Sequence, residues 1–436
     1  MTERRYRGIL AALAALGLAV RLLWARAASR EPQGLVDPAR YLHYARAIAD
    51  GKGMVEWTGN PTAYYPPGYP WFAGIVTWLS QPFTDSPWAA ILVVQAFIAA
   101  AGCVLAACLA RRLAGPVAGL VAAGVFALYP NLVFHSGVLL GETLFNTLFL
   151  AFLVLALRRP AAEARRPPEL VAVGVVLGLA VLVRPISLAV VPVLFAIWWW
   201  ARRDVRAALG ATAVVVVGTA ACILPWTVRN QLRMHELVPI STNTGENLCI
   251  GNSPDADGAF TLSAHCDFGN GLDSPAMEVE VDQRKTRYAL GRIARDPGRQ
   301  PWLVWRRFWF TWVRDGDHDG LVAVQSYNLD PWIEPDTREG LARVADVTYW
   351  VVCAAGLAGA AGLVARRRPE DLLMVGATVV IAAVPLAFFG DARFKVPVIP
   401  LLIVLAATNL RHLAPAAPAE AEPVGPGEPA TTADET

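Results

Sequence analysis

Long apolar stretches, separated by short polar segments rich in arginine, repeat along most of this 436-residue chain. A helix needs about 20 mostly apolar residues to cross a bilayer. Ten stretches reach or approach that length, and they predict ten transmembrane helices. They cover residues 8–24, 88–110, 117–134, 138–157, 170–183, 187–201, 207–226, 346–365, 371–389 and 395–410.

The composition agrees with this pattern. Hydrophobic residues make up 55% of the chain and charged residues only 17%, which is less charge than soluble domains carry. We therefore predict an all-α polytopic membrane protein, with a large soluble core as the alternative. The net charge of +2 gives no indication of a nucleic-acid partner.

Basic residues cluster before the first predicted span and after every second one. If there are ten spans, these clusters all lie on one side of the membrane, and the positive-inside rule makes that side cytoplasmic. The pattern predicts a multi-pass protein of the cell membrane with both ends of the chain in the cytoplasm. The clusters are Arg4, Arg5 and Arg7; Arg111 and Arg112; Arg158, Arg159, Arg165 and Arg166; Arg202, Arg203 and Arg206; Arg366, Arg367 and Arg368; and Arg411.

The first span admits a second interpretation. Residues 25–27, Ala-Arg-Ala, resemble a signal-peptidase site, so removal of the first span is an open alternative. If the span is retained, we expect Arg21 to extend toward the outer interface, with its apolar stem along the helix.

The same pattern divides the chain into four parts. Residues 1–226 form a membrane region whose first outer loop, 25–87, carries the predicted site. Residues 227–345 form an outer-face loop domain, because such a length exceeds that of a simple connection. Residues 346–411 supply the last membrane helices. Residues 412–436, rich in Ala, Pro and Glu, are predicted to be a disordered cytoplasmic tail.

One segment of the loop domain mixes tryptophan with arginine. This composition at 302–312 predicts a helix lying in the membrane interface, with a buried helix of the loop domain as the alternative.

Two acids stand where predicted helices meet the outer face. Asp37 precedes Pro38, which is typical of a helix start with Asp37 as the N-cap. Asp37 is therefore either a catalytic residue or only a helix cap. Glu142 opens an apolar helix, where an ionisable group is costly and often functional. The alternative for Glu142 is stabilisation by the helix dipole. His135 is interpreted as a structural, hydrogen-bonded residue.

Four cations lie on the predicted outer side, where the positive-inside rule disfavours them. They are Arg184, Arg229, Arg393 and Lys395. Their position favours an anionic partner such as a lipid-linked phosphate, because arginine binds phosphate through two parallel hydrogen bonds. Simple anchoring to lipid headgroups is the alternative.

Cysteine use gives one further prediction. Four of the six cysteines fall in apolar spans, whereas Cys249 and Cys266 lie in the long outer loop. That side of a cell membrane is oxidising, so we predict a disulfide between them. No Cys/His spacing indicates a zinc site.

The run 315–320, Asp-Gly-Asp-His-Asp-Gly, matches the first half of a calcium-binding loop. The match then fails, because Ser326 stands where an acidic ligand is expected. The chain also has no Walker A motif, no nucleotide-binding glycine motif and no Gly-x-Ser-x-Gly.

Seven motifs, in order along the chain, together resemble the GT-C glycosyltransferases, and within them glycosyltransferase family 39 with its protein O-mannosyltransferase and aminoarabinose-transferase branches. The resemblance covers nearly the whole membrane region. The motifs are Asp37-x-x-Arg40-Tyr41, Tyr65-Pro66-Pro67-Gly68-Tyr69-Pro70, Leu128-Tyr129-Pro130, Glu142-Thr143-Leu144-Phe145, Val183-Arg184-Pro185, Pro225-Trp226-Thr227-Val228-Arg229-Asn230 and Asp391-Ala392-Arg393-Phe394.

The resemblance implies a mechanism. Such enzymes transfer a sugar from a polyprenyl-phosphate donor to an acceptor hydroxyl on the outer face of the membrane. Asp37 would act as the general base, and Arg184 and Arg393 would hold the leaving phosphate. Glu142 would orient the acceptor or bind a divalent cation, and no other cofactor is implied. The acceptor could be a glycan, a lipid or a protein.

The remaining residues carried by these motifs are expected to contact substrate. Tyr41 and Tyr65 would shape the donor pocket, beside Arg40. The chain departs from the family at Pro38, where many relatives have a second acid, and this weakens the case for a metal in the first loop. It also departs at Phe394, where relatives often have tyrosine.

Two functions of other classes stay open. A transporter or lipid flippase would place charges at the bilayer midplane and show inverted repeats, and no repeat is visible in the sequence. A non-catalytic membrane scaffold would need neither Asp37 nor Arg393.

Overall fold

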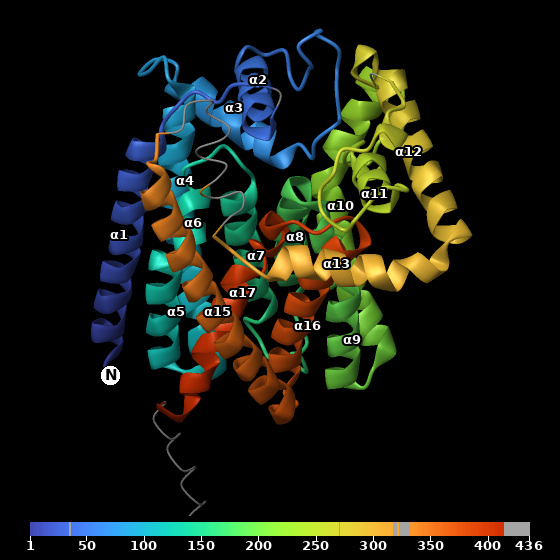
Figure 1. Ribbon diagram of the computed structural model, residues 1–436. Coiled ribbons are helices and arrows are strands. Elements are labelled where there is room, and N and C mark those ends of the chain that lie inside the picture. Colours follow the sequence, from blue (N-terminus) through green and yellow to red (C-terminus); the bar gives the residue numbers. More distant parts are fainter. Residues whose placement is uncertain (35, 270, 317–320, 322–331, 414–436) are drawn as a thin grey trace, which may run out of the picture.

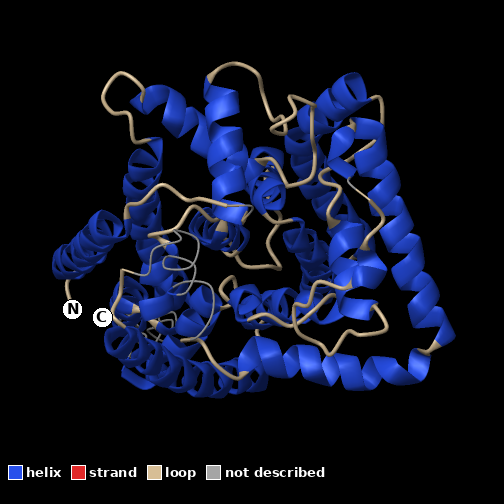
Figure 2. Ribbon diagram, turned by 45° about the horizontal axis from the view of Figure 1, so that its top comes forward, coloured by secondary structure: helices blue, strands red, loops and turns tan. Residues whose placement is uncertain are grey.

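The computed structural model describes residues 1–413, except 35, 270, 317–320 and 322–331. Within these residues the protein is helical, with two isolated β-bridges and no longer strand (Figure 2). The predicted tail lies, from residue 414 onward, outside the described part.

Each of the ten predicted spans coincides with an apolar helix (Figure 1). Proline opens many of these helices, at a position where its missing N–H has no partner to lose. The helices are α1 (Glu3–Ala28), α4 (Pro87–Ala114), α5 (Pro116–Leu128), α7 (Glu142–Ala156), α8 (Pro167–Val183), α9 (Val190–Arg202, preceded by the 3₁₀ turn Pro185–Ala189), α10 (Val205–Met234), α15 (Pro335–Arg366), α16 (Pro369–Ala383, continued by Val384–Ala387) and α17 (Ile399–Ala407, continued by Thr408–Leu413).

Length and composition divide these ten segments into two groups. Among the described residues, six are long and apolar enough to cross a membrane, and four shorter apolar helices complete the set. The prediction of a polytopic all-α membrane protein is therefore confirmed. The four shorter segments are α5, α7, α8 and α17 with its 3₁₀ continuation.

The arginine-rich connections gather at one end of the bundle, at the bottom of Figure 1, which we call the arginine end. Glu3 at the start of α1 accepts a 2.7 Å hydrogen bond from Arg111 at the end of α4. Arg366 at the end of α15 donates to Leu113, and the Ala161 amide before α8 donates to Glu370 in α16. These contacts confirm that the basic clusters share one side, as the alternation predicts.

The remaining helices cover the opposite end, which we call the site end. They are α2 (Asp37–Ala49), α3 (Gly68–Ser80), α6 (Pro130–His135), α11 (Thr244–Asn252), α12 (Pro275–Arg295) and α13 (Gln300–Trp312). In Figure 1, α2 lies at the top, α12 runs down the upper right side beside α11, and α13 runs across the bundle. Trp302, Trp305 and Trp309 of α13 are about half exposed, while Leu303 and Arg307 are buried. The prediction that α13 lies in the membrane interface stays a prediction.

The membrane helices extend beyond the predicted limits of the loop domain. α10 continues to Met234, two turns past residue 226, and α15 begins at Pro335, ten residues before 345. The ends of the segment 227–345 are therefore parts of membrane helices, and its separate character as a domain stays a prediction.

Arg21 does not extend toward the outer interface, so that prediction is wrong. Its side chain is fully buried and donates to the carbonyls of Ala127 at 2.8 Å and Phe126 at 3.0 Å. These carbonyls end α5, where Pro130 prevents the helix from continuing and leaves them without backbone partners. A charge inside the bundle is tolerated here because it satisfies these groups.

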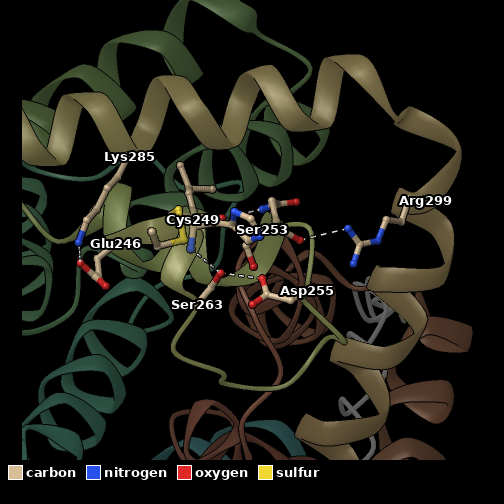
Figure 3. Close-up of a disulfide and its surroundings, with 11 residues drawn as sticks. Glu246, Cys249, Ser253, Asp255, Ser263, Lys285 and Arg299 are labelled. Atoms are coloured by element: carbon tan, nitrogen blue, oxygen red, sulfur yellow. Dashed lines mark hydrogen bonds and ion pairs between the residues drawn. A yellow bond between two sulfur atoms is a disulfide. The ribbon is translucent and has the colours of Figure 1, made fainter. Parts of the chain in front are cut away.

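The predicted disulfide is present. Cys249 in α11 is bonded to Cys266 in a 3₁₀ turn, closing a loop with a sequence separation of 17 residues (Figure 3). The loop fixes α11 beside the connection that leads to α12, so this bond holds the outer part of the site end together.

Removing this bond with Cys249→Ser and Cys266→Ser together should lower the melting temperature, because the unfolded chain regains the freedom that the closed loop had removed. For a loop of this size the loss is about 3 kcal/mol. Thermal unfolding in detergent, compared with Cys108→Ser as a free-cysteine control, measures it. An unchanged melting temperature would show that the loop is held by other contacts.

Candidate functional site

Asp37 lies at the site end with its carboxylate held from two sides. The Tyr65 hydroxyl donates to Oδ1 at 2.5 Å, and the Arg393 guanidinium donates to Oδ2 at 2.7 Å. About a third of the side chain is exposed. Asp37 is the first residue of α2 and Val36 is the N-cap, so the prediction of Asp37 as a cap is wrong. Its carboxylate faces other segments instead.

Glu142 lies deeper. It is the first residue of α7 and is fully buried. Its Oε1 accepts hydrogen bonds from both Arg184 and Arg393. Its Oε2 is buried and has no hydrogen-bond partner among the described residues. Glu142 therefore pairs with two guanidinium groups at once, and its stabilisation does not depend on the helix dipole alone.

These four residues form what we call the central cluster: Asp37, Glu142, Arg184 and Arg393. They come from the start of α2, the start of α7, the end of α8 and the 3₁₀ turn Ala392–Lys395, which precedes α17. Arg393 joins the two acids, across sequence separations of 356 and 251 residues. The formal charges of two acids and two arginines cancel, so the cluster is neutral.

Local backbone structure positions the two arginines. Arg184 ends α8 in an extended conformation because Pro185 follows it. The Arg393 amide donates to the Asp391 side chain at 2.8 Å, which caps the 3₁₀ turn. Each arginine side chain is only 16% exposed, so both are largely enclosed within the site end.

Tyrosines line one side of Asp37. The ring of Tyr41, one turn along α2, packs against Tyr65 and Tyr69 at 4.9 Å each. Burial and the neighbouring Asp37 carboxylate raise the pKa of Tyr65 well above its usual range. Its hydroxyl therefore stays protonated and donates to Asp37.

Two of the predicted cations lie elsewhere. Lys395 is completely buried, donates to Thr311 and Arg314, and forms an ion pair with the buried Asp315 at 3.3 Å. It ties the turn that carries Arg393 to the end of α13. In the run that matches the first half of a calcium-binding loop, Asp315 has these structural contacts. Residues 317–320 and Ser326 lie outside the described part.

Arg229, in α10, donates to the carbonyls of Met54 at 2.6 Å and Thr62 at 2.9 Å. It thus anchors the first outer loop to the bundle and does not reach the central cluster. Arg40, three residues after Asp37, lies over the rings of Tyr64 at 5.1 Å and Trp57 at 5.5 Å. No salt-bridge partner of Arg40 exists among the described residues.

The sequence reasoning missed Glu278 in α12. This buried carboxylate accepts hydrogen bonds from Thr62, Ala63 and Thr242, at 2.7, 3.0 and 2.5 Å. Burial raises its pKa, and the bonds from the two threonines oppose that rise. Glu278 therefore joins the first outer loop to the segment before α11.

Next to Glu278 is a pocket of about 180 Å³, which we call the side pocket. Polar and charged side chains dominate its lining. Glu278, Asp282 and Lys285 recur at helical spacing along α12, a signal that was present in the sequence. The lining residues are Arg40, Tyr64, Thr242, Glu246, Gly269, Gly271, Glu278, Val281, Asp282 and Lys285.

The central cluster does not fit the predicted divalent cation. Two guanidinium groups hold the only Glu142 oxygen that has a partner, and a cation there would face their charge. Among the described residues, no group of three or more His, Cys, Asp or Glu side chains is arranged to hold a metal ion.

Comparisons with known proteins agree with this architecture. A family model described as dolichyl-phosphate-mannose-protein mannosyltransferase matches residues 65–228. A search of curated protein sequences finds no match. Among solved structures, the apo oligosaccharyltransferase of Archaeoglobus fulgidus superposes with a TM-score of 0.55 and 15% identity, covering 93% of this chain and 50% of that one.

The same archaeal enzyme, AglB, in complex with an inhibitory peptide and a dolichol-phosphate, gives a TM-score of 0.51 at 15% identity, over 92% and 50% of the two chains. The chain spans about half the length of these structures. ArnT from Cupriavidus metallidurans bound to undecaprenyl phosphate gives a TM-score of 0.43 at 15% identity, over 91% and 77%. The two archaeal structures show the fold and confirm that it is of the GT-C type.

Glu142→Gln should strongly destabilise the protein, because Arg184 and Arg393 would then lie together without their shared anion. Breaking a buried ion pair by removing one partner costs about 3–5 kcal/mol. Unfolding in detergent measures the loss, with the exposed Glu163→Gln as control. Adding Arg184→Gln to Glu142→Gln should recover part of it, and a wild-type melting temperature for the single variant would contradict the ion-pair assignment.

Asp282 makes a pH-dependent contribution to stability. Burial raises its pKa from 3.8 to about 6, so the folded protein holds this proton more tightly than the unfolded chain. The contribution is complete below about pH 4 and is lost as the pH rises through 6. Asparagine does not titrate. The melting temperature of Asp282→Asn, relative to that of wild type, should therefore rise as the pH increases from 4 to 7. The exposed Asp296→Asn should track wild type at each pH, and a parallel response of both variants would refute the assignment.

Proposed function

We propose that the protein is a glycosyltransferase that moves a sugar from a polyprenyl-phosphate donor to an acceptor hydroxyl. The observation that carries this proposal is the central cluster at one end of a GT-C bundle. In it the partly exposed Asp37 carboxylate accepts from Arg393, and the buried Glu142 joins Arg393 to Arg184. A base and a phosphate-binding pair are the groups that such a transfer requires.

Asp37 is the proposed general base. Its carboxylate is about one-third exposed and is held in place by two hydrogen-bond donors, so an acceptor hydroxyl can reach it at a fixed position. The acceptor O–H proton passes to Asp37 while the acceptor oxygen attacks the anomeric carbon. A new C–O bond forms, the bond to the phosphate oxygen breaks, and polyprenyl phosphate leaves with the electron pair.

Arg184 and Arg393 are the proposed phosphate ligands, because developing negative charge on the leaving oxygen is stabilised by donors already held in place. The contacts support a positioning role for Glu142, since one of its oxygens accepts hydrogen bonds from both guanidinium groups and so holds them together. Tyr41 and Tyr65 would then border the donor sugar beside Asp37.

The comparisons support the donor class. The matching family model is described by a dolichyl-phosphate-mannose donor, and the archaeal structure was solved with dolichol-phosphate. The comparisons say less about the acceptor. The archaeal enzyme was solved with an inhibitory peptide, and the family model names a protein. We propose that residues 227–345, which contribute α11 and α12 at the site end, select the acceptor (Figure 1).

The proposed active site faces the outside of the cell membrane. The basic clusters share the arginine end, and the positive-inside rule assigns that end to the cytoplasm. The site end then opens on the extracytoplasmic face, where the disulfide of the same region would persist. Both acids of the cluster begin helices, and this placement supports a transferase over a transporter with charges at the midplane.

Asp37→Asn should abolish transfer while leaving the fold intact, since it keeps the shape of the side chain and removes only the base. We expect a loss of roughly 10²–10⁴-fold in the rate. The assay follows radiolabelled sugar from polyprenyl-phosphate donors into membrane acceptors, with the exposed Asp50→Asn at the C-cap of the same helix as control. Full activity in a folded Asp37→Asn protein would show that Asp37 is not the base. If wild-type protein transfers no sugar from any donor tested, that result would argue against a transferase.

A further inference from the structure

The side pocket lies close to Asp37, because its lining includes Arg40 of the same helix and Tyr64, the neighbour of Tyr65. Arg40 stands three residues after Asp37, so the two side chains project from neighbouring positions on one face of α2. Tyr64 lines the pocket, and the next residue, Tyr65, donates to Asp37 Oδ1. Oδ2 faces Arg393 instead. One partner of the carboxylate is thus an arginine of the proposed phosphate-binding pair, and the other is the residue next to a side chain that lines the pocket.

The pocket is built from separate parts of the chain that are fixed together. Glu278 joins the first outer loop to the segment before α11 through three hydrogen bonds. The Gly245 amide donates to Asp282 at 2.6 Å, and Lys285 pairs with Glu246, as Figure 3 shows. The disulfide holds α11 one turn beyond Glu246. These contacts make a preformed cavity rather than a gap between mobile loops.

Arg40 is the cation in this pocket whose guanidinium group is not paired with an acid at contact distance. Lys285 has Glu246, whereas no side-chain hydrogen bond or ion pair of Arg40 occurs among the described residues. Two aromatic rings hold its guanidinium plane at 5.1 and 5.5 Å. Its N–H groups are thus oriented and available to a ligand, since an aromatic face offers no acceptor of the strength of an oxygen.

The lining matches a polyhydroxylated ring. It offers donors at Arg40 and Lys285, acceptors at Glu246 and Asp282, and hydroxyl groups at Tyr64 and Thr242 that do both. Val281 is the one aliphatic residue larger than glycine in it, so a lipid chain finds no apolar wall. The volume of about 180 Å³ is below the roughly 300–1,000 Å³ of pockets for drug-sized ligands. It suits one small ring.

We propose that the side pocket is the acceptor subsite and that it takes a sugar residue, so that the acceptor is a glycan. This inference rests on the proposed function, because a bound sugar is an acceptor only in a transferase. A serine or threonine side chain of a peptide acceptor would leave most of the charged lining unpaired, which is costly for a desolvated site. A sugar placed there presents a hydroxyl to Asp37 on the side opposite the leaving phosphate.

Binding tests the pocket without any need for catalysis. Saturation-transfer NMR would be run with wild-type protein in nanodiscs and a panel of methyl hexosides and methyl pentosides. At least one glycoside should bind, and Arg40→Ala should weaken it roughly ten- to a hundredfold, as for the loss of a charged hydrogen bond. Arg40→Lys should restore part of the binding. The matched control is Arg46→Ala on the same helix, whose exposed side chain pairs with Glu31.

Absence of glycoside binding to folded wild type, or binding that Arg40→Ala leaves unchanged, would overturn the proposal. Displacement of the glycoside by a serine-containing peptide, with the peptide also labelled in the transfer assay, would assign the pocket to a protein acceptor and overturn it as well. If Arg40→Ala fails to fold, Asp282→Asn provides the second variant, with the same weakening expected.

Kinetics separates this proposal from the proposed function. In an active enzyme, Arg40→Ala should raise KM for the acceptor at least tenfold and leave KM for the donor unchanged, whereas loss of Arg184 should act on the donor. Pocket-dependent glycoside binding without any transfer would support the sugar site and refute the transferase. Transfer with an unchanged acceptor KM would support the transferase and refute the subsite.

Discussion

Arg393 is the residue on which the site depends, because its one guanidinium group holds both acids. It brings the start of α2 to the start of α7, although α2 lies above the bundle and Glu142 is buried within it. Its own position depends on Lys395 two residues later, whose buried ammonium is tied to the Asp315 carboxylate and the end of α13. The turn is therefore fixed by an ion pair that is completely buried. The same turn carries Arg393, whose side chain extends to the two acids.

This arrangement resolves an electrostatic conflict. A phosphate-binding site needs cations, but two adjacent guanidinium groups repel one another in a poorly solvated place. Glu142 removes that repulsion and leaves the cluster neutral, so that the fold carries no uncompensated charge in the absence of the proposed donor. The cost is a weaker attraction for the phosphate than two free arginines would give. Geometry rather than excess charge would then determine donor binding.

The membrane helices could be predicted from the sequence because hydrophobic length is a strong and local signal. The positions of the arginine clusters are equally local, and they predicted that the connections carrying them lie at one end of the bundle. The site could be predicted only in part. Asp37, Glu142, Arg184 and Arg393 were found through motifs, but nothing local shows that Lys395 points inward while Arg393, two residues earlier, faces the acids. Arg21 was misjudged because its partners, the free carbonyls of α5, exist only once Pro130 has ended that helix in the fold.

The outer part of the site shows why a common fold leaves room for different acceptors. The bundle supplies Glu142, Arg184 and Arg393 from helix ends that the GT-C fold holds in place. Glu278, by contrast, joins elements outside the membrane helices, and the side pocket is formed where they meet. The pocket is also tied to the segment that leads into the turn carrying Arg393, because the Arg307 side chain donates to the carbonyls of Gly251 in α11 and of Leu386. In the proposed function, the bundle carries the chemistry and the elements outside it choose the acceptor, as expected when function is set by sites added to a shared fold.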